Sequence, residues 1–216
     1  VINYLSYSHL DPDHTFGMRV IEQLRLNWLD LSINKKCDNP IKVLALPNVL
    51  NDVNALSTKY GSIFDYYESL NLIKRKSVNK RIVINDIKIT FVPANEEATV
   101  TIFIFEQNGK KLIYAPCDVK PFPNSRLFYD ADYLIIGNTI IGNILKSNFY
   151  LTKNNPLNLE LFSFEEVLEL KAKYNIQNVI ITHLEEDWGK SYDDYLNYEK
   201  ECIAIKFAYD GMTIEL

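Results

Sequence analysis

Short apolar runs bounded by turn residues recur along the chain, and they predict strands. Most such runs are four to eight residues long, rich in Val, Ile, Tyr or Phe, which is typical of strands that face a core. The predicted strands are residues 1–8, 41–46, 81–84, 87–92, 99–106, 111–115, 133–136 and 179–182. Asn85-Asp86 and Asn108-Gly109 separate two pairs of these runs. These dipeptides predict hairpins, because both central positions of the tight turn need a positive φ.

Helical spacing appears in fewer places. Apolar residues recur at intervals of three and four between residues 13 and 31, which predicts one helix with a single buried face. The positions are Met18, Ile21, Leu24, Trp28 and Leu31. Ser163 and Glu166 form a capping-box pattern that predicts a helix ending near residue 174, and Ser191 is expected to cap another short helix.

The remaining segments have mixed signals. Residues 48–75 are expected to contain a helix and irregular structure, and residues 137–162 a long loop, which in a compact domain is more often functional than accidental. Residues 203–209 and 212–216 are expected to pair across Asp210-Gly211 as a final hairpin. A block of hairpins between alternating strands and helices favours a layered α/β sandwich over a doubly wound parallel sheet. The whole chain, residues 1–216, is expected to be one domain.

Composition narrows the class of protein. The 216 residues are 47% hydrophobic and 24% charged, as in a globular protein with a sizeable core, and the net charge of -5 argues against nucleic-acid and anionic-membrane partners. The basic run at 74–76 and 80–81 is expected in a solvated hairpin or loop. Three cysteines without a CxxC spacing indicate free thiols in a reducing compartment. With no apolar run of about 20 residues and no signal peptide, the expected location is cytoplasmic.

Two of the three histidines fall within a few residues of each other, in His9-x-Asp11-x-Asp13-His14. All four side chains can ligate a metal, and a strand end followed by a helix start can present them on one edge. The alternative is that the acids are helix N-caps and the histidines are ordinary surface groups. The motif by itself leaves both interpretations open.

Two strand ends add further candidate ligands. Asp118 follows the predicted strand 111–115, and His183, the last histidine, follows the strand 179–182. Alone, Asp118 could be a turn residue and His183 a capped core histidine. However, every histidine of the chain now lies at a strand end or a strand–helix turn, which favours a shared site.

The pattern His9-x-Asp11-x-Asp13-His14-x-x-Gly17 resembles the HxHxDHxxG signature of metallo-β-lactamase fold hydrolases. Asp118 resembles their metal-bridging aspartate, His183 their final histidine, and the closing AYDGMTIEL is similar to the last hairpin of the PhnP-like phosphodiesterase branch. The resemblance implies a four-layer αβ/βα sandwich with a dinuclear site at one edge. That family has several strands before its first motif, and here only one is predicted. Either the chain is trimmed or partly disordered, or its first sheet is reduced.

The resemblance also implies a ligand set. One ion would be held by His9 and the residue at 11, the other by Asp13, His14 and His183, with Asp118 bridging. The chain departs from the family twice, because Asp11 and Glu96 stand where histidines are expected. Both departures fall on the first ion, whose site becomes rich in oxygen ligands and so favours Mn, Fe or Mg. One or two divalent ions, Zn, Mn or Fe, are the expected cofactors.

The implied activity is hydrolysis of a small phosphodiester or cyclic phosphate by a metal-activated hydroxide. Asp13, expected to be buried, would accept a proton and Asp118 would hold the ion pair, while Glu185 and Glu186 would orient ligands or lie in a solvated turn. Loops 119–126 and 137–162 would contact a small anionic substrate, with Arg126 meeting its charge. The alternative is a degenerate, non-hydrolytic metal-binding or interaction protein that retains the fold. A homodimer is left open.

Overall fold

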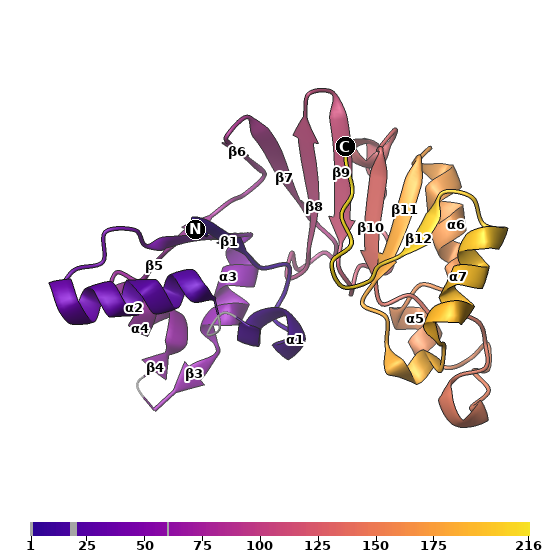
Figure 1. The fold of residues 1–216 in the computed structure, drawn as a ribbon, viewed down its shortest axis with the longest axis horizontal. Helices are drawn as coiled ribbons and strands as arrows, with labels where there is room; N and C mark the ends of the chain where they lie inside the picture. The colour runs from indigo at the N-terminus through magenta and orange to yellow at the C-terminus, as the bar shows by residue number, and fades with distance from the viewer. Residues whose placement is uncertain (1, 18–20, 60) are drawn as a thin grey trace. The chain divides into compact units, whose positions relative to one another are not determined.

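The computed structural model describes residues 2–17, 21–59 and 61–216. It divides into two compact units: the first comprises residues 1–82 and 91–101, and the second comprises residues 83–90 and 102–216. Figure 1 shows both units as a ribbon. No helix among the described residues is long and apolar enough to cross a membrane.

A three-stranded parallel sheet forms the centre of the first unit. Its order is β1-β2-β5, with Tyr4 opposite Lys42 and Ile41 opposite Ile73. Strand β2 is the middle one and its apolar residues are fully buried, as expected of a strand covered on both faces. The elements are β1 (Tyr4–Ser6), α1 (Pro12–Thr15), α2 (Glu22–Asn34), β2 (Ile41–Ala45), α3 (Pro47–Asn54), β3 (Ser57–Thr58), β4 (Gly61–Ser62), α4 (Ile63–Ser69) and β5 (Ile73–Ser77).

The prediction of one helix over residues 13–31 was wrong. The structure has α1, which ends at Thr15, and a separate α2, which begins at Glu22; Met18, part of the predicted face, lies outside the described residues. Gly17 falls in this interval, and glycine costs a helix interior about 1 kcal/mol relative to alanine. The side-chain hydroxyl of Thr15 also donates back to the Asp11 carbonyl at 2.8 Å, a local bond that competes with helix continuation.

The buried face of α2 is partly polar, which the apolar pattern did not predict. Leu24 is buried, and so are Gln23 and Asn27. The Gln23 amide donates to Asn27 Oδ1 at 2.9 Å, and the Asn27 amide donates to the carbonyls of Asn39 and Leu72 at 3.0 and 3.2 Å. These bonds fix α2 to the entry of β2 and the entry of β5.

A larger sheet, with the strand order β12-β11-β10-β9-β8-β7-β6, contains the strands of the second unit; residues 81–82 of β6, 91–93 of β7 and 101 of β8 are counted with the first unit. Strands β9 to β12 are mutually parallel, and β8 is antiparallel to β9. Helices α6 and α7 pack on β12 through Phe207, which contacts Phe164 and Tyr195. The elements are β6 (Arg81–Ile84), β7 (Ile87–Pro93), β8 (Thr101–Gln107), β9 (Lys110–Ala115), β10 (Tyr133–Gly137), α6 (Phe164–Lys173), β11 (Asn178–Thr182), α7 (Tyr192–Glu201) and β12 (Ile205–Phe207).

Local turn and cap signals were confirmed. Asn108 and Gly109 have φ of 52° and 78°, and Gln107 pairs with Lys110 across them. Asn85 and Asp86 have φ of 47° and 66° between β6 and β7. Both capping regions form complete capping boxes, at the start of α6 and of α7.

Two other predictions were wrong. The expected final hairpin does not form: residues 208–216 form no strand, and the strand partner of β12 is β11, in parallel. The basic run at 74–76 is part of β5 rather than a loop or hairpin. The guanidinium of Arg75 contacts Asp65 and Glu68 there, both at 2.6 Å, so its charge is compensated by α4.

The long segment 137–162 is mostly irregular, as predicted, with short ordered pieces. These are η3 (Lys146–Asn148), α5 (Leu157–Glu160) and two isolated bridges, Ile140 to Ser163 and Ile144 to Tyr150. The ammonium of Lys120 donates to the carbonyls of Asn158 and Leu161 and to Glu166 Oε2. This contact ties the loop after β9 to the end of the long segment.

Asp132 joins β9 to β10 with both carboxylate oxygens. Oδ2 accepts from the Lys111 amide at 2.8 Å and Oδ1 from the Lys110 ammonium at 3.0 Å. The Lys111 amide first, and then the Lys110 ammonium, hold the pKa of this carboxyl below its usual value. A depressed pKa stabilises the fold at pH values above the unfolded pKa, about 3.9, and the contribution is lost as the pH falls through the folded pKa.

We therefore expect Asp132→Asn to lower the free energy of unfolding by about 2 kcal/mol at pH 7, since it weakens two hydrogen bonds to a charged acceptor. The difference from wild type should shrink as the pH is lowered from 5 to 3. Urea unfolding at several pH values measures it, with the exposed Asp210→Asn as control. A difference that stays constant over this range would contradict the assignment.

Candidate metal centre

His9 lies in the first unit, in the segment between β1 and α1. His9 is buried, with only 3% of its surface exposed. Its Nδ1 lies 2.9 Å from the Ser8 hydroxyl, and its Nε2 lies 3.6 Å from Asp11 Oδ2. The Ser8 carbonyl accepts a hydrogen bond from the Thr101 amide at 2.8 Å. His9 is therefore held by its neighbours and is not an ordinary surface histidine.

A short helix then presents the second histidine. Pro12 starts α1, and the His14 amide donates to the Asp11 carbonyl at 3.0 Å, which closes the turn. His14 Nε2 lies 3.2 Å from Asp13 Oδ2, and the rings of His9 and His14 are 4.3 Å apart between centroids.

Within this motif, potential metal-ligating atoms lie within 4.8 Å of each other in three pairs of residues: His9–Asp11, His9–His14 and Asp13–His14.

The acids of this turn do not act as helix caps. Asp11 occupies the N-cap position of α1, yet its side chain makes no capping hydrogen bond. The capping alternative for Asp11 therefore has no support in the geometry. The expectation that Asp13 is buried was wrong: 55% of its side chain is exposed, because a four-residue helix covers little of its own first turn.

The second unit supplies ligand-type residues at two strand ends. Asp118 follows β9 by three residues, and His183 directly follows β11. Both have a left-handed backbone, with φ of 53° and 54°. Non-glycine residues adopt this conformation infrequently, and it clusters at functional sites. Here it turns the chain sharply at the point where each strand ends.

Gly137 lies between these two strand ends. Strand β10 pairs with β9 on one side and β11 on the other, all in parallel, so the three carboxyl ends meet at one edge. A Cβ on Gly137 would lie 1.4 Å from the Pro116 carbonyl oxygen and 3.4 Å from His183 Cβ. Only glycine permits this approach, and the turn that carries Asp118 is thereby brought beside His183. Sequence reasoning missed Gly137, although a glycine ending a buried apolar strand is a usable signal.

Of the two acids after His183, one contacts it. Glu185 Oε1 lies 2.9 Å from His183 Nε2, whereas Glu186, in η4 (Glu186–Trp188), pairs with the ammonium of Lys146. The side-chain bond from Lys146 lowers the pKa of Glu186. Glu185 is thus placed to orient the imidazole, and Glu186 instead links η4 to η3.

Cys117 is a further residue that sequence reasoning missed as a ligand type. It is buried and precedes Asp118 directly. A thiol is chemically able to ligate zinc or iron. The three cysteines were predicted to be free thiols, and Cys117, which is buried and forms no disulfide, was not considered as a ligand.

Glu96 and Arg126 lie in exposed positions. Glu96 is in a turn closed by the bond from the Ala98 amide to the Asn95 carbonyl, at 3.2 Å, and it belongs to none of the groups of three or more ligand-type residues among the described positions. Arg126 begins η2 (Arg126–Phe128), whose N-cap is Ser125.

The chain is similar to known proteins in its structure. No family model matches the chain, and no curated protein sequence matches it. Solved structures do match. Zn²⁺-bound PqqB from Methylobacterium extorquens has a TM-score of 0.64 at 18% identity, over 100% of this chain and 71% of that one. A diphosphatase of the PhnP family has a TM-score of 0.65 at 13% identity, over 98% and 69%.

A third match is the metallo-β-lactamase fold protein YhfI from Bacillus subtilis, with a TM-score of 0.65 at 11% identity, over 97% of this chain and 76% of that one. At these identities the likeness speaks to the fold. It agrees with the mixed α/β elements and with the family that the sequence motif resembles. The chain therefore has the metallo-β-lactamase fold.

Proposed function

We propose that the chain is a metal-dependent hydrolase in which the two units form one domain around a shared metal centre. The observation that carries this proposal is the pairing of imidazole and carboxylate on one short turn, His9 with Asp11 and His14 with Asp13. Asp118 and His183, at one sheet edge of the second unit, supply the remaining ligand types. The likeness to PqqB with bound Zn²⁺ and to a PhnP-family diphosphatase supports it.

The proposed ligand assignment follows the family pattern. One ion would be held by His9 and Asp11, with Glu96 as the candidate third ligand; the other by Asp13, His14 and His183; and Asp118 would bridge them. The donor set fits divalent ions of intermediate hardness, because neutral imidazole and carboxylate suit Zn²⁺, Mn²⁺ and Fe²⁺ alike. The first position has one imidazole only, which favours Mn²⁺ or Fe²⁺ over Zn²⁺ there.

When bound, such ions supply Lewis-acid activation of water and polarisation of the bond to be cleaved. The chain's own residues do the rest. The Ser8 hydroxyl fixes the orientation of His9 through Nδ1, and Glu185 contacts His183, as partners of metal-bound histidines commonly do. The Asp13 carboxylate is exposed and can accept a proton from the attacking water.

The proposed substrate is a small phosphodiester or cyclic phosphate. A PhnP-family diphosphatase shares the fold, and Arg126 offers an exposed cation on the loop after β9. The second candidate function is a metal-binding protein without hydrolytic activity. The exposed turn of Glu96 favours it, because without Glu96 the first ion would keep only His9, Asp11 and the bridging Asp118.

We expect Asp118→Ala and His183→Ala each to remove one tightly held ion, lowering metal affinity more than about 100-fold, since each deletes a direct ligand. Hydrolysis of bis-p-nitrophenyl phosphate should be lost with it. Metal analysis and turnover with Mn²⁺, Fe²⁺ and Zn²⁺ measure both effects.

The matched control is Glu186→Gln, which removes an exposed acid of the same loop and should keep both metal and turnover. Stoichiometric metal retained in both alanine variants would refute the ligand assignment. A wild-type chain that binds metal but turns over no substrate with any of the three ions would favour the non-hydrolytic candidate.

Gly137→Ala tests whether the common edge of β9, β10 and β11 positions the proposed ligands, without changing a ligand residue. Its Cβ would collide with the Pro116 carbonyl, so we expect a loss of about 3 kcal/mol in the free energy of unfolding and weaker metal binding. Gly211→Ala is the control, because its Cβ would meet no atom within 4 Å and only its positive φ is strained, at about 1 kcal/mol. Equal metal affinity in both variants would show that this edge does not position the ligands.

Asp11→His restores the family residue at the first ion. We expect the preference for Zn²⁺ over Mn²⁺ to rise at least about tenfold, equivalent to about 1.4 kcal/mol, because an imidazole replaces a harder oxygen donor. Competition between the two ions, followed by metal analysis, measures the change. An unchanged preference would place residue 11 outside the coordination sphere.

A further inference from the structure

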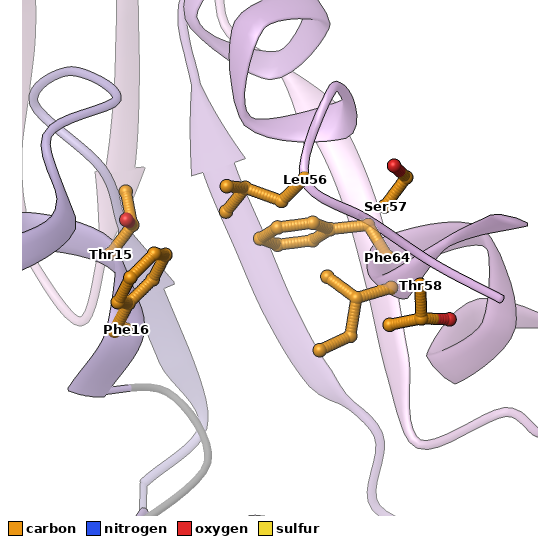
Figure 2. A pocket seen from close by; sticks show the side chains of 7 residues that line it. Thr15, Phe16, Leu56, Ser57, Thr58 and Phe64 are labelled. Carbon is orange, nitrogen blue, oxygen red and sulfur yellow. The ribbon is translucent and has the colours of Figure 1, made fainter.

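A pocket of about 380 Å³ opens in the first unit, next to the helix that carries His14. Figure 2 shows its lining, with Thr15 and Phe16 on one side and side chains of the β3–β4 region and α4 on the other. The lining residues are Thr15, Phe16, Leu56, Ser57, Thr58, Ile63 and Phe64. Its volume is within the range of small-molecule sites, which run from about 300 to 1,000 Å³.

The described part of the lining is largely apolar. Phe16, Leu56, Ile63 and Phe64 supply most of it, and none of the lining residues that the structure describes is charged. Two of the hydroxyls are engaged within the chain: Thr15 donates to the Asp11 carbonyl at 2.8 Å and Thr58 to the Gly61 carbonyl at 3.3 Å. A charged or strongly hydrated group would lose water here without gaining matching partners, so the pocket suits an apolar group.

The two aromatic residues of the lining differ in exposure. Phe64 is 1% exposed and packs edge-to-face on Tyr7 at 5.6 Å, two residues before His9. Phe16, which directly follows α1, is 60% exposed. Thr15, which lines the pocket, directly follows His14 in the sequence, and Tyr7, which packs on the lining residue Phe64, lies two residues before His9.

We propose that this pocket binds an apolar group of the substrate, an aryl ring or a short branched alkyl chain, while the scissile phosphoester lies at the metal centre. The inference rests on the proposed function and makes it narrower: the substrate is a phosphodiester with one apolar ester group. Phe16 and Leu56 are then specificity-determining residues. They act on the choice of ester group and not on the chemical step.

Two substrates with the same leaving group test this choice: bis-p-nitrophenyl phosphate, whose retained group is aryl, and methyl p-nitrophenyl phosphate. We expect wild type to favour the aryl ester in kcat/KM. Phe16→Ala, which opens the pocket, and Leu56→Trp, which fills it, should each reduce the aryl-to-methyl ratio about tenfold. Ile33→Ala, which removes an exposed apolar side chain of α2, is the matched control and should leave the ratio unchanged.

Direct binding separates a failure of this inference from a failure of the proposed function. The ¹⁹F NMR signal of 4-fluorophenol should broaden on binding to the metal-free full chain and to Ile33→Ala. It should broaden much less with Leu56→Trp. If wild type hydrolyses neither ester with any metal, the proposed function fails and the ¹⁹F result alone decides whether the pocket takes an aryl group. If turnover occurs and the ratio is the same in all four proteins, the inference is overturned, whatever the ¹⁹F result.

Discussion

The parallel pairing of β9, β10 and β11 is the constraint on which the second unit's share of the site depends. Parallel strands end at a common edge, so residues that follow them are neighbours without any contact between their side chains. Gly137 tightens this arrangement, because the Pro116 carbonyl occupies the place where a Cβ would be. Asp118 and His183 then leave their strands through left-handed turns, and the sheet edge becomes a place where ligands can collect.

Local signals in the sequence predicted much of this architecture. Asn108-Gly109 requires a tight turn whatever surrounds it, and Ser163 with Glu166 caps a helix from within four residues. Tertiary effects were not predictable in the same way. The polar face of α2 is buried because Asn27 donates hydrogen bonds to the carbonyls of Asn39 and Leu72. The turn signal at Asp210-Gly211 did not decide the fate of residues 208–216, which form no strand.

For the candidate site too, the sequence predicted some features, and others depend on tertiary packing. Residue types, spacing and the family resemblance predicted a set of ligands, because few side chain types bind metals and these are concentrated in the motif and at strand ends: His9, Asp11, Asp13, His14, Asp118 and His183. Spacing could not reveal how each is supported. Ser8 beside His9, Glu185 beside His183 and the glycine at 137 are matters of packing, and they decide whether ligand-type residues are oriented as ligands.

The proposed metal centre requires that residues of both units hold the same ions. A crystal of the full chain grown with Mn²⁺, with anomalous scattering recorded at the manganese edge, tests it most directly. The account predicts a peak within about 2.0–2.3 Å of nitrogen or oxygen atoms of both His14 and His183, allowing for typical metal–ligand distances. Peaks coordinated by residues of one unit alone, or no peak at these histidines, would contradict it.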